Sequence, residues 1–134
     1  MMTMMGGKLK DMQRNQNLGT WGEDQALAHL LSKGLVLLDR NFRVVVGEVD
    51  LIMDDKGTLV FVEVKTRRSL QYGSPEESIT QTKKEKIYKA AIEYIERNQL
   101  DPCDWRMDVV AIECSIDNEV TRIDHYANIE YQAS

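Results

Sequence analysis

The stretch from residue 47 to residue 66, GEVDLIMDDKGTLVFVEVKT, constrains the fold of this chain more than any other. Two apolar runs flank the turn-forming residues 54–57, so the stretch predicts a β-hairpin. We expect the turn to be centred on Asp55 and Lys56. Because side chains alternate along a strand, this register brings four charged residues to one face of the hairpin: Glu48, Asp50, Glu63 and Lys65.

In this register Glu48 lies opposite Glu63, and Asp50 lies opposite Phe61. Asp50 and Glu63 are then diagonal neighbours with a backbone separation of roughly 7–8 Å. Two carboxylates at that separation are able to share a cation. A shift of one residue would place them on opposite faces, so the prediction depends on the register.

The hairpin is apolar on both faces, because Phe61 shares the face of the acids and the opposite face carries Val49, Leu51 and Met53. Such strands lie inside layered folds, where a carboxylate needs a charge partner or a metal ion. Lys65 neutralises only one of the three acids, and a divalent cation would relieve the rest. A structural ion pair between Lys65 and a glutamate at the wet end of the sheet explains the spacing equally well.

Composition limits the class of protein. A chain of 134 residues, of which 43% are hydrophobic, is long enough for one domain with a core. We expect a disordered tail over residues 1–17, a single domain over 18–134, and a cytoplasmic location without a membrane span. Two cysteines give no disulfide framework or zinc motif, and the net charge of −5 confines nucleic-acid binding to a local patch.

A first helix is predicted from Thr20 to about Gly34, and Glu23 has two interpretations within it. The sequence Thr20-Trp21-Gly22-Glu23 fits a capping box, in which the Glu23 side chain binds its own backbone. Glu23 also shares a helical face with Leu27, and that face should pack on the sheet. In the second interpretation Glu23 points towards the acids of the hairpin.

The remaining elements complete a small α/β domain with a mixed sheet and helices flanking it. An interrupted strand over 35–38 and 42–46 precedes the hairpin, and a loop over 71–75 follows it. A helix capped by Thr80 runs to about Asn98 with a buried stripe of Ile87, Ala91, Tyr94 and Ile95. Two further strands are predicted over 105–114 and 120–123.

Basic residues are concentrated next to the acids. Residues 65–89 contain seven basic residues against three acidic ones. A solvated helix face explains such lysines more often than a binding site does. A cation-loaded acidic site beside a basic strip nevertheless suits a phosphodiester, since the strip attracts the backbone. The chain has no glycine-rich phosphate loop and no GxSxG motif, and its two histidines, His29 and His125, make a nucleophile–histidine triad improbable.

These residues resemble a known nuclease pattern. Glu23, Asp50 and Glu63-Val64-Lys65, with twelve residues between Asp50 and Glu63, resemble the PD-(D/E)XK nuclease superfamily. The wider pattern is similar to the bacterial YraN family, which is related to archaeal Holliday-junction resolvases. The matching segments are Gly22–Ala26, Arg40–Arg43, Gly47–Ile52, Val60–Arg67, Gly73–Glu77 and Asp108–Val110.

The resemblance implies a restriction-endonuclease-like, three-layer fold and a catalytic set of Glu23, Asp50, Glu63 and Lys65. Asp50, Glu63 and the Val64 carbonyl would hold Mg²⁺ or Mn²⁺, and Lys65 would position the attacking water. Glu48 would support these ligands or form an ion pair. Six residues are expected to contact nucleic acid: Arg43, Arg67, Arg68, Lys83, Lys84 and Lys86.

Three functions follow as hypotheses. The first is a divalent-metal-dependent DNA endonuclease, selective for branched or damaged DNA and, by its resolvase kinship, a homodimer. The second is a nucleic-acid-binding module that cleaves nothing. The third is a protein-interaction domain in which the acids and lysines form structural ion pairs.

Overall fold

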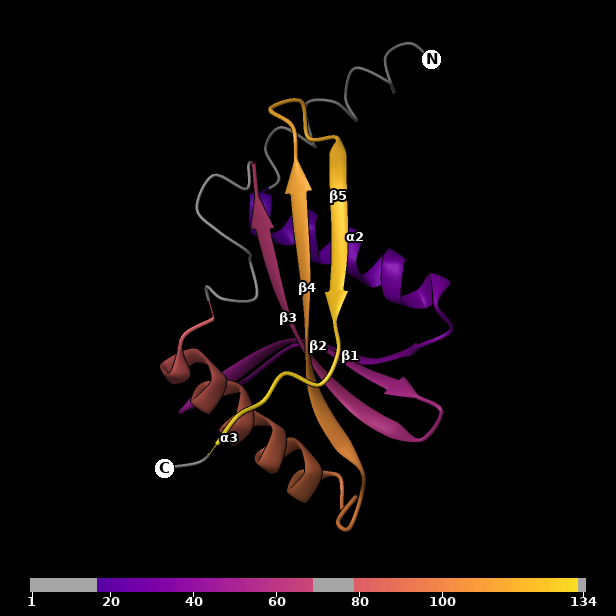
Figure 1. Cartoon of the computed structure of the whole chain (residues 1–134). Helices are drawn as coiled ribbons and strands as arrows, with labels where there is room; N and C mark the ends of the chain where they lie inside the picture. The colour runs from indigo at the N-terminus through magenta and orange to yellow at the C-terminus, as the bar shows by residue number, and fades with distance from the viewer. Residues whose placement is uncertain (1–16, 69–78, 133–134) are drawn as a thin grey trace, which may run out of the picture.

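Two helices pack on a five-stranded mixed sheet in the computed structural model, which describes residues 17–68 and 79–132 (Figure 1). The helices are α2 (Leu18–Ser32) and α3 (Gln81–Arg97). The strands are β1 (Val36–Val44), β2 (Gly47–Asp55), β3 (Thr58–Arg67), β4 (Trp105–Cys114) and β5 (Val120–Tyr126). Of the predicted tail over 1–17, residues 1–16 lie outside the described residues, whereas Asn17 is described; the predicted loop over 71–75 also lies outside them.

The strands lie in the sheet in their chain order, β1-β2-β3-β4-β5. All neighbours are antiparallel except β3 and β4, which are parallel and are joined through α3. A parallel pair needs such a crossover because its second strand must begin at the same end as the first. The predicted α/β class and mixed sheet are confirmed.

The two helices cover opposite faces of the sheet. On the α2 side, Trp21, Ala26 and Leu30 pack against buried residues of β2, β3 and β4, among them Leu51 and Val62. On the α3 side, the second cluster is built around Phe61 and contains the following buried helix residues: Ile87, Ala90, Ala91 and Ile95. The domain therefore has the expected three layers. Figure 1 also shows the strong twist of the sheet, since β1 and β2 cross the view while β4 and β5 stand nearly upright.

The turn of the central hairpin differs from the prediction by two positions in the register. Asp55 pairs with Thr58, and the turn consists of Lys56 and Gly57, whose φ angles are 52° and 96°. A two-residue turn with both φ angles positive matches the right-handed twist of the strands, and glycine suits its second position. The predicted pairs Asp50–Phe61 and Glu48–Glu63 are therefore wrong, because Phe61 pairs with Ile52 and the ladder ends at Leu51–Val62. A shift of two residues keeps every side chain on its face, so the predicted grouping of the acids does not depend on this error.

The alternation of side chains fails at one position of β2. Leu51 and Met53 share one face, as their alternation predicts, and this face packs on the α2 side, but Val49 joins the α3-side cluster together with Ile52. The ladder between β2 and β3 ends at the pair Leu51–Val62, so β2 is no longer held flat against β3 beyond that point. Asp50 is the residue at which the change occurs.

The first helix begins earlier than predicted. Asn17 is its N-cap, and the Asn17 Oδ1 accepts a hydrogen bond of 2.7 Å from the backbone N–H of Thr20. Asparagine caps a helix at least as well as threonine. Glu23 consequently lies in the second turn, and the capping-box interpretation of this residue is wrong. The Thr80 cap of α3 is confirmed, because Thr80 Oγ1 accepts from the N–H of Lys83 at 3.1 Å.

Two strands differ from their predicted bounds. β1 is continuous through residues 39–41, where the sequence predicts an interruption; a register shift between Leu37 and Asp39 and the positive φ of Asn41 absorb the polar residues. β5 extends to Tyr126, because His125 pairs with Val110 and contacts buried groups. Neither helix among the described residues is long and apolar enough to cross a membrane.

Candidate functional site

The predicted acids gather where β2 and β3 separate, between the start of α2 and the start of α3. We call this group the acidic cluster, and its members are Glu23, Glu48, Asp50, Glu63, Lys65 and Lys83. Two glycines allow the helices to come this close. A Cβ on Gly22 would collide with the side chain of Thr66 in β3, and a Cβ on Gly47 would collide with the backbone carbonyl of Lys86 in α3. Each glycine directly precedes a glutamate of the site. The two close approaches therefore fix the backbone positions from which the Glu23 and Glu48 side chains extend.

Asp50 and Glu63 form the centre of the cluster. The last pair of the β2–β3 ladder, Leu51–Val62, comes immediately before them. Asp50 Oδ2 accepts a hydrogen bond of 2.8 Å from the backbone N–H of Val64. Glu63 is only 5% exposed, and its Oε2 is buried without a hydrogen-bond donor. A buried carboxylate oxygen without a donor is costly, so this position favours a proton or a cation.

Two lysines approach these acids from different elements. Lys65 Nζ of β3 lies 4.0 Å from Glu63 Oε1, at the outer limit of an ion pair. Lys83 Nζ of α3 lies 2.8 Å from Glu48 Oε1 and 3.7 Å from Glu63 Oε1. The sequence predicts Lys83 as a contact to nucleic acid, and the structure places its ammonium among the acids, with the side chain 22% exposed.

Glu23 completes the cluster from the α2 side. Its side chain is 16% exposed, and Oε1 lies 3.5 Å from Arg40 Nε without forming a hydrogen bond. Arg40 is held more tightly by Asp24, whose Oδ1 lies 2.7 Å from Arg40 Nη2. The charge of Asp50 acts on Glu23, so the two side chains lie close enough to repel each other. This interaction agrees with the second interpretation of Glu23, in which its side chain faces the acids of the hairpin.

The cluster holds more negative charge than its lysines stabilise. Burial, followed by the charge of Asp50, raises the pKa of Glu63 to about 8. Burial also raises the pKa of Asp50, against the opposing effects of the Val64 N–H and Lys83. The pKa of Glu23 is raised by burial and by Asp50. Burial and the neighbouring charge of Asp50 therefore both favour the protonated form of Glu63 in the absence of a bound cation.

Two further members, Glu48 and Lys83, carry ordinary charges. The hydrogen bond from Lys83, together with its charge, lowers the pKa of Glu48. Burial alone would lower the pKa of Lys83, but Glu48 and Glu63 raise it overall. Lys83 and Glu48 thus form a stable ion pair at the edge of the cluster, while Asp50 and Glu63 form the part that is short of positive charge.

The donors of this central part suit a hard divalent cation. Mg²⁺ and Mn²⁺ prefer oxygen ligands, and Mg²⁺ keeps several waters while binding one or two carboxylates. The described part of the chain contains no group of three or more His, Cys, Asp or Glu side chains arranged to hold a metal ion. Two carboxylates, one of them with an unsatisfied buried oxygen, are the donor set of a partly hydrated ion and not of a closed structural site.

The other basic residues predicted to contact nucleic acid are spread around the cluster. Arg43 is 75% exposed and lies 3.9 Å from Glu48. Lys86 is exposed on α3, while Lys84 and Arg67 are half-buried. The guanidinium of Arg68 binds the β4–β5 connection through Ser115 O at 3.1 Å and Asn118 Oδ1 at 3.1 Å. Arg68 is thus engaged within the chain, whereas Arg43 and Lys86 are open to solvent.

A second buried polar cluster lies on β4 and β5. Asp108 is 1% exposed and accepts four hydrogen bonds, from His125 Nε2 at 2.7 Å, Arg106 Nε at 3.0 Å, Arg106 Nη2 at 3.2 Å and the Asn128 N–H at 2.9 Å. Burial would raise the pKa of Asp108, but His125 and Arg106 lower it overall. His125 therefore has a structural role. The cluster is fully satisfied and joins the C-terminal segment to the sheet.

The sequence analysis missed three features of the site: two ion pairs between distant residues, and the close packing at two glycines. The ion pair of Lys83 with Glu48 joins positions 35 residues apart, and no local pattern announces it. The link between Arg40 and Asp24 also joins residues of two different elements, β1 and α2. The two Gly-Glu dipeptides at 22–23 and 47–48 are visible in the sequence, and a glycine inside a helix or strand does signal a close backbone approach.

Comparison with known proteins gives one consistent family. The family model described as "Uncharacterised protein family UPF0102" matches residues 22–112. A UPF0102 protein of Caldicellulosiruptor saccharolyticus is 42% identical over 113 residues, covering 84% of this chain and 96% of that protein. A UPF0102 protein of Trichlorobacter lovleyi is 44% identical over 115 residues, covering 85% and 90%. The matched range contains every residue of the acidic cluster.

Proposed function

The chain belongs to the UPF0102 family, and we propose that it is a divalent-cation-dependent endonuclease that hydrolyses phosphodiester bonds in DNA. The observation that carries the proposal is the buried Glu63 carboxylate beside Asp50, with one oxygen lacking a donor and its pKa raised to about 8. Such perturbed groups are typical of functional sites. The PD-(D/E)XK pattern of the sequence supports the same assignment.

Asp50, Glu63 and the Val64 carbonyl would hold Mg²⁺ or Mn²⁺. When bound, such an ion lowers the pKa of a coordinated water and polarises a phosphate oxygen. Both carboxylates must be ionised to act as ligands, so the site is most competent when Glu63 has lost its proton. The N–H of Val64 orients the Asp50 carboxylate for this task.

Lys65 acts next to these ligands. Its Nζ lies 4.0 Å from Glu63 and its side chain is 31% exposed, so the ammonium can reach both the cluster and a bound phosphate. There it positions the attacking water and offsets the charge that develops on the phosphate. Lys83 is committed to Glu48 and keeps the edge of the cluster neutral. Glu23 supports the site from α2 and is restrained by Arg40.

We propose DNA as the substrate because exposed basic side chains lie around the acidic cluster. This local positive charge stands out in a protein whose net charge is negative. Arg43 and Lys86 are open to solvent beside Glu48 and are placed to contact backbone phosphates. The resemblance to resolvases extends the proposal to branched or damaged DNA, cut by a homodimer.

A second candidate is a nucleic-acid-binding module without cleavage. The close pair of Lys83 and Glu48, and the absence among the described residues of three clustered metal-ligating side chains, favour it. In that case the acids and lysines are structural, and binding is sensitive to salt and indifferent to divalent ions.

Cleavage assays separate the two. The protein is incubated with branched and linear DNA in Mg²⁺ or Mn²⁺, together with Asp50→Asn, Glu63→Gln and Lys65→Met variants. We expect metal-dependent cutting by the wild-type protein and a loss on the order of 10²-fold or more in each variant. Asp117→Asn is the matched control, since Asp117 is an exposed acid of the β4–β5 turn. Binding without cutting at any divalent-ion concentration would leave the second candidate.

A further inference from the structure

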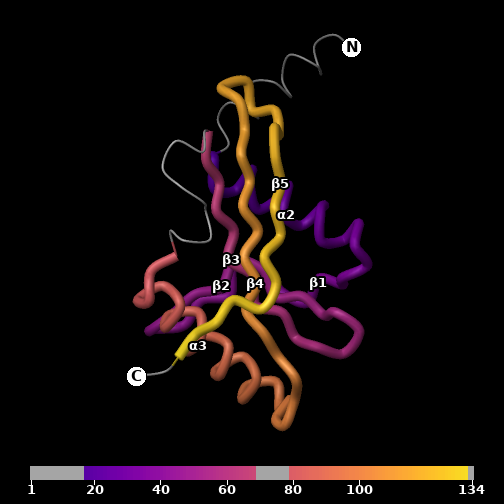
Figure 2. Tube along the Cα trace, in the orientation of Figure 1, coloured from indigo at the N-terminus to yellow at the C-terminus, as the bar shows by residue number. Residues whose placement is uncertain are grey.

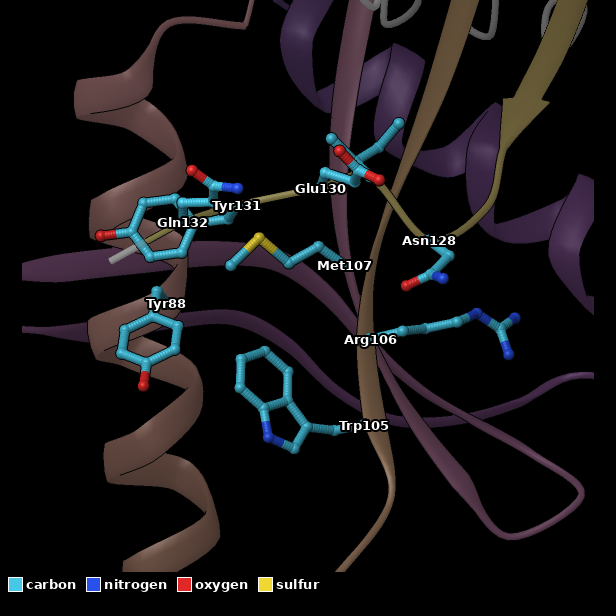
Figure 3. A pocket seen from close by; sticks show the side chains of 9 residues that line it. Tyr88, Trp105, Arg106, Met107, Asn128, Glu130, Tyr131 and Gln132 are labelled. Atoms are coloured by element: carbon cyan, nitrogen blue, oxygen red, sulfur yellow. The ribbon is translucent and has the colours of Figure 1, made fainter. Parts of the chain in front are cut away.

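One groove of the described structure lies away from the acidic cluster. It has a volume of about 440 Å³ and three walls: Tyr88 of α3, the start of β4 with Trp105 and Met107, and the C-terminal segment 128–132 (Figure 3). Its size is that of a site for a small molecule or a single nucleotide. Neither Asp50 nor Glu63 lines it, so the mechanism proposed above leaves it without a role.

Three aromatic rings form one side of the groove. The Tyr88 and Tyr131 ring centroids are 5.1 Å apart with an interplanar angle of 38°, and those of Tyr88 and Trp105 are 5.6 Å apart at 48°. The rings are tilted and half-buried, so none of them covers the face of its neighbour completely. An aromatic wall of this kind attracts a flat ring that can stack on it.

Polar side chains also line the groove. Asn128, Glu130 and Gln132 supply amide and carboxylate groups, which together offer hydrogen-bond donors and acceptors. The backbone N–H of Asn128 is bound to buried Asp108, and this bond fixes the segment against the sheet. A ligand that presents a flat ring and a polar edge matches the aromatic and the polar lining of the groove, and nucleobases have this chemistry.

The groove is connected to the acidic cluster through the first two turns of α3. Gln81 Nε2 donates a hydrogen bond of 3.0 Å to the Gln132 carbonyl, which ties the C-terminal segment to the start of the helix. Figure 2 shows this segment running back to that end of α3. Lys83, two residues beyond Gln81, belongs to the cluster. Lys84 lies one turn before Tyr88 on the same helical face, where an ammonium suits a phosphate.

We propose that this groove binds one unpaired nucleobase of a DNA strand, stacked on Tyr88, Tyr131 and Trp105 with its phosphate at Lys84. The consequence for substrate choice rests on the proposed nuclease function: the site would favour DNA that carries an unpaired nucleotide near the cleaved bond. The binding itself needs no cleavage and is tested without metal.

The test uses the full chain in EDTA and the fluorescence of Trp105, which lines the groove. The other tryptophan, Trp21, is buried on the opposite face of the sheet and supplies a constant background. The probe is a short single-stranded oligonucleotide, compared with an abasic oligonucleotide that has the same number of phosphates. We expect saturable quenching by the first, and about tenfold or more weaker binding of the second.

Two variants of one residue isolate stacking. Tyr131→Ala removes a ring at the rim while keeping the Trp105 reporter, and it should abolish the preference over the abasic probe. Tyr131→Phe keeps the ring and should retain the preference. Circular-dichroism melting of both variants verifies the fold. Equal affinity for the two probes, or an unchanged preference in Tyr131→Ala, would overturn the proposal.

An Asp50→Asn protein separates this proposal from the nuclease function. Base-dependent binding by Asp50→Asn, with no cutting by any form of the protein, would support the groove and reject the nuclease. Metal-dependent cutting by the wild-type protein without a base preference would reject the groove alone. Quenching by free aromatic amino acids and not by oligonucleotides would also reject it.

Discussion

Asp50 Oδ2 accepts a hydrogen bond from the backbone N–H of Val64 across the point where β2 and β3 separate. This side-chain bond links the two strands beyond the backbone ladder, whose last pair is Leu51–Val62. It holds the Asp50 carboxylate beside Glu63, whose own oxygen lacks a donor. Two acids that would repel each other are thereby kept together by the backbone, and this geometry gives the following predictions.

The stability of the metal-free protein should decrease as pH rises through the range set by Glu63. The pKa of Glu63 is raised from 4.5 to about 8, so the folded state binds an extra proton between these values. The favourable contribution of the neutral acid is complete below about pH 4.5 and is lost as pH rises through about 8. Glu63→Gln mimics the neutral acid and should be more stable than the wild type at pH 8, by roughly 1–3 kcal/mol.

Denaturant unfolding of both proteins at several pH values in EDTA measures this difference. The comparison removes the opposite contribution of His29, whose pKa is lowered by burial and by Lys33, because His29 is present in both proteins. Parallel stability curves for wild type and Glu63→Gln between pH 5 and 8 would show that Glu63 ionises normally.

Lys83 should matter more for stability than its neighbours on α3. Its removal leaves Glu48 and Glu63 without their nearest ammonium, since Lys83 Nζ lies 2.8 Å and 3.7 Å from them. Lys83→Met should cost about 1–3 kcal/mol of unfolding free energy at pH 8. Lys86→Met is the control: Lys86 is exposed, and its replacement should change stability by less than about 0.5 kcal/mol. Equal effects of the two changes in urea unfolding would contradict the arrangement.

The close contact between Gly22 and Thr66 should be intolerant of a single methyl group. Alanine normally stabilises a helix relative to glycine by roughly 0.5–1 kcal/mol. Gly22→Ala should instead destabilise the protein, because its Cβ would collide with Thr66 Oγ1 and Cγ2. Thr66→Ala removes both of these atoms, so the double variant should recover part of the loss in a double-mutant cycle. Additive effects would place the helix farther from β3.

The Asp108 network should be structural. Asp108→Ala leaves Arg106 and the Asn128 N–H without their buried partner, and a loss of about 3–5 kcal/mol is expected. Asp124→Ala, which removes a half-buried acid of β5, is a milder comparison. Thermal melting distinguishes the two, and similar midpoints would show that Asp108 is not a buried anchor.

The sequence predicts the elements well where local chemistry decides them. The alternation of the hairpin, the apolar stripe of α3 and its Thr80 cap are read from neighbouring residues, and all three reappear with small changes. The turn is misplaced in the prediction because Lys56 has a positive φ angle, which a lysine seldom adopts. The grouping of Asp50 and Glu63 withstands this error, since a shift of two preserves the face.

Long-range contacts set the limit of such prediction. Lys83 looks like one of several lysines on a helix surface, and only the packing of Gly47 against Lys86 brings it to Glu48. The local sequence favours Thr20 as the N-cap of the first helix, but Asn17 caps it instead. Glu23 therefore lies in the second turn, where its side chain does not cap the helix backbone. Val49 changes faces because β2 leaves its ladder at Asp50, which no alternation rule foresees.

Location of a bound Mn²⁺ by its anomalous scattering, in crystals of the wild-type protein at pH 8, tests the central claim most directly. We predict one peak between Asp50 and Glu63, with the Val64 carbonyl among its ligands, and no peak in Glu63→Gln crystals. A wild-type map without a peak there, with Lys83 or Lys65 filling the position, would contradict the account.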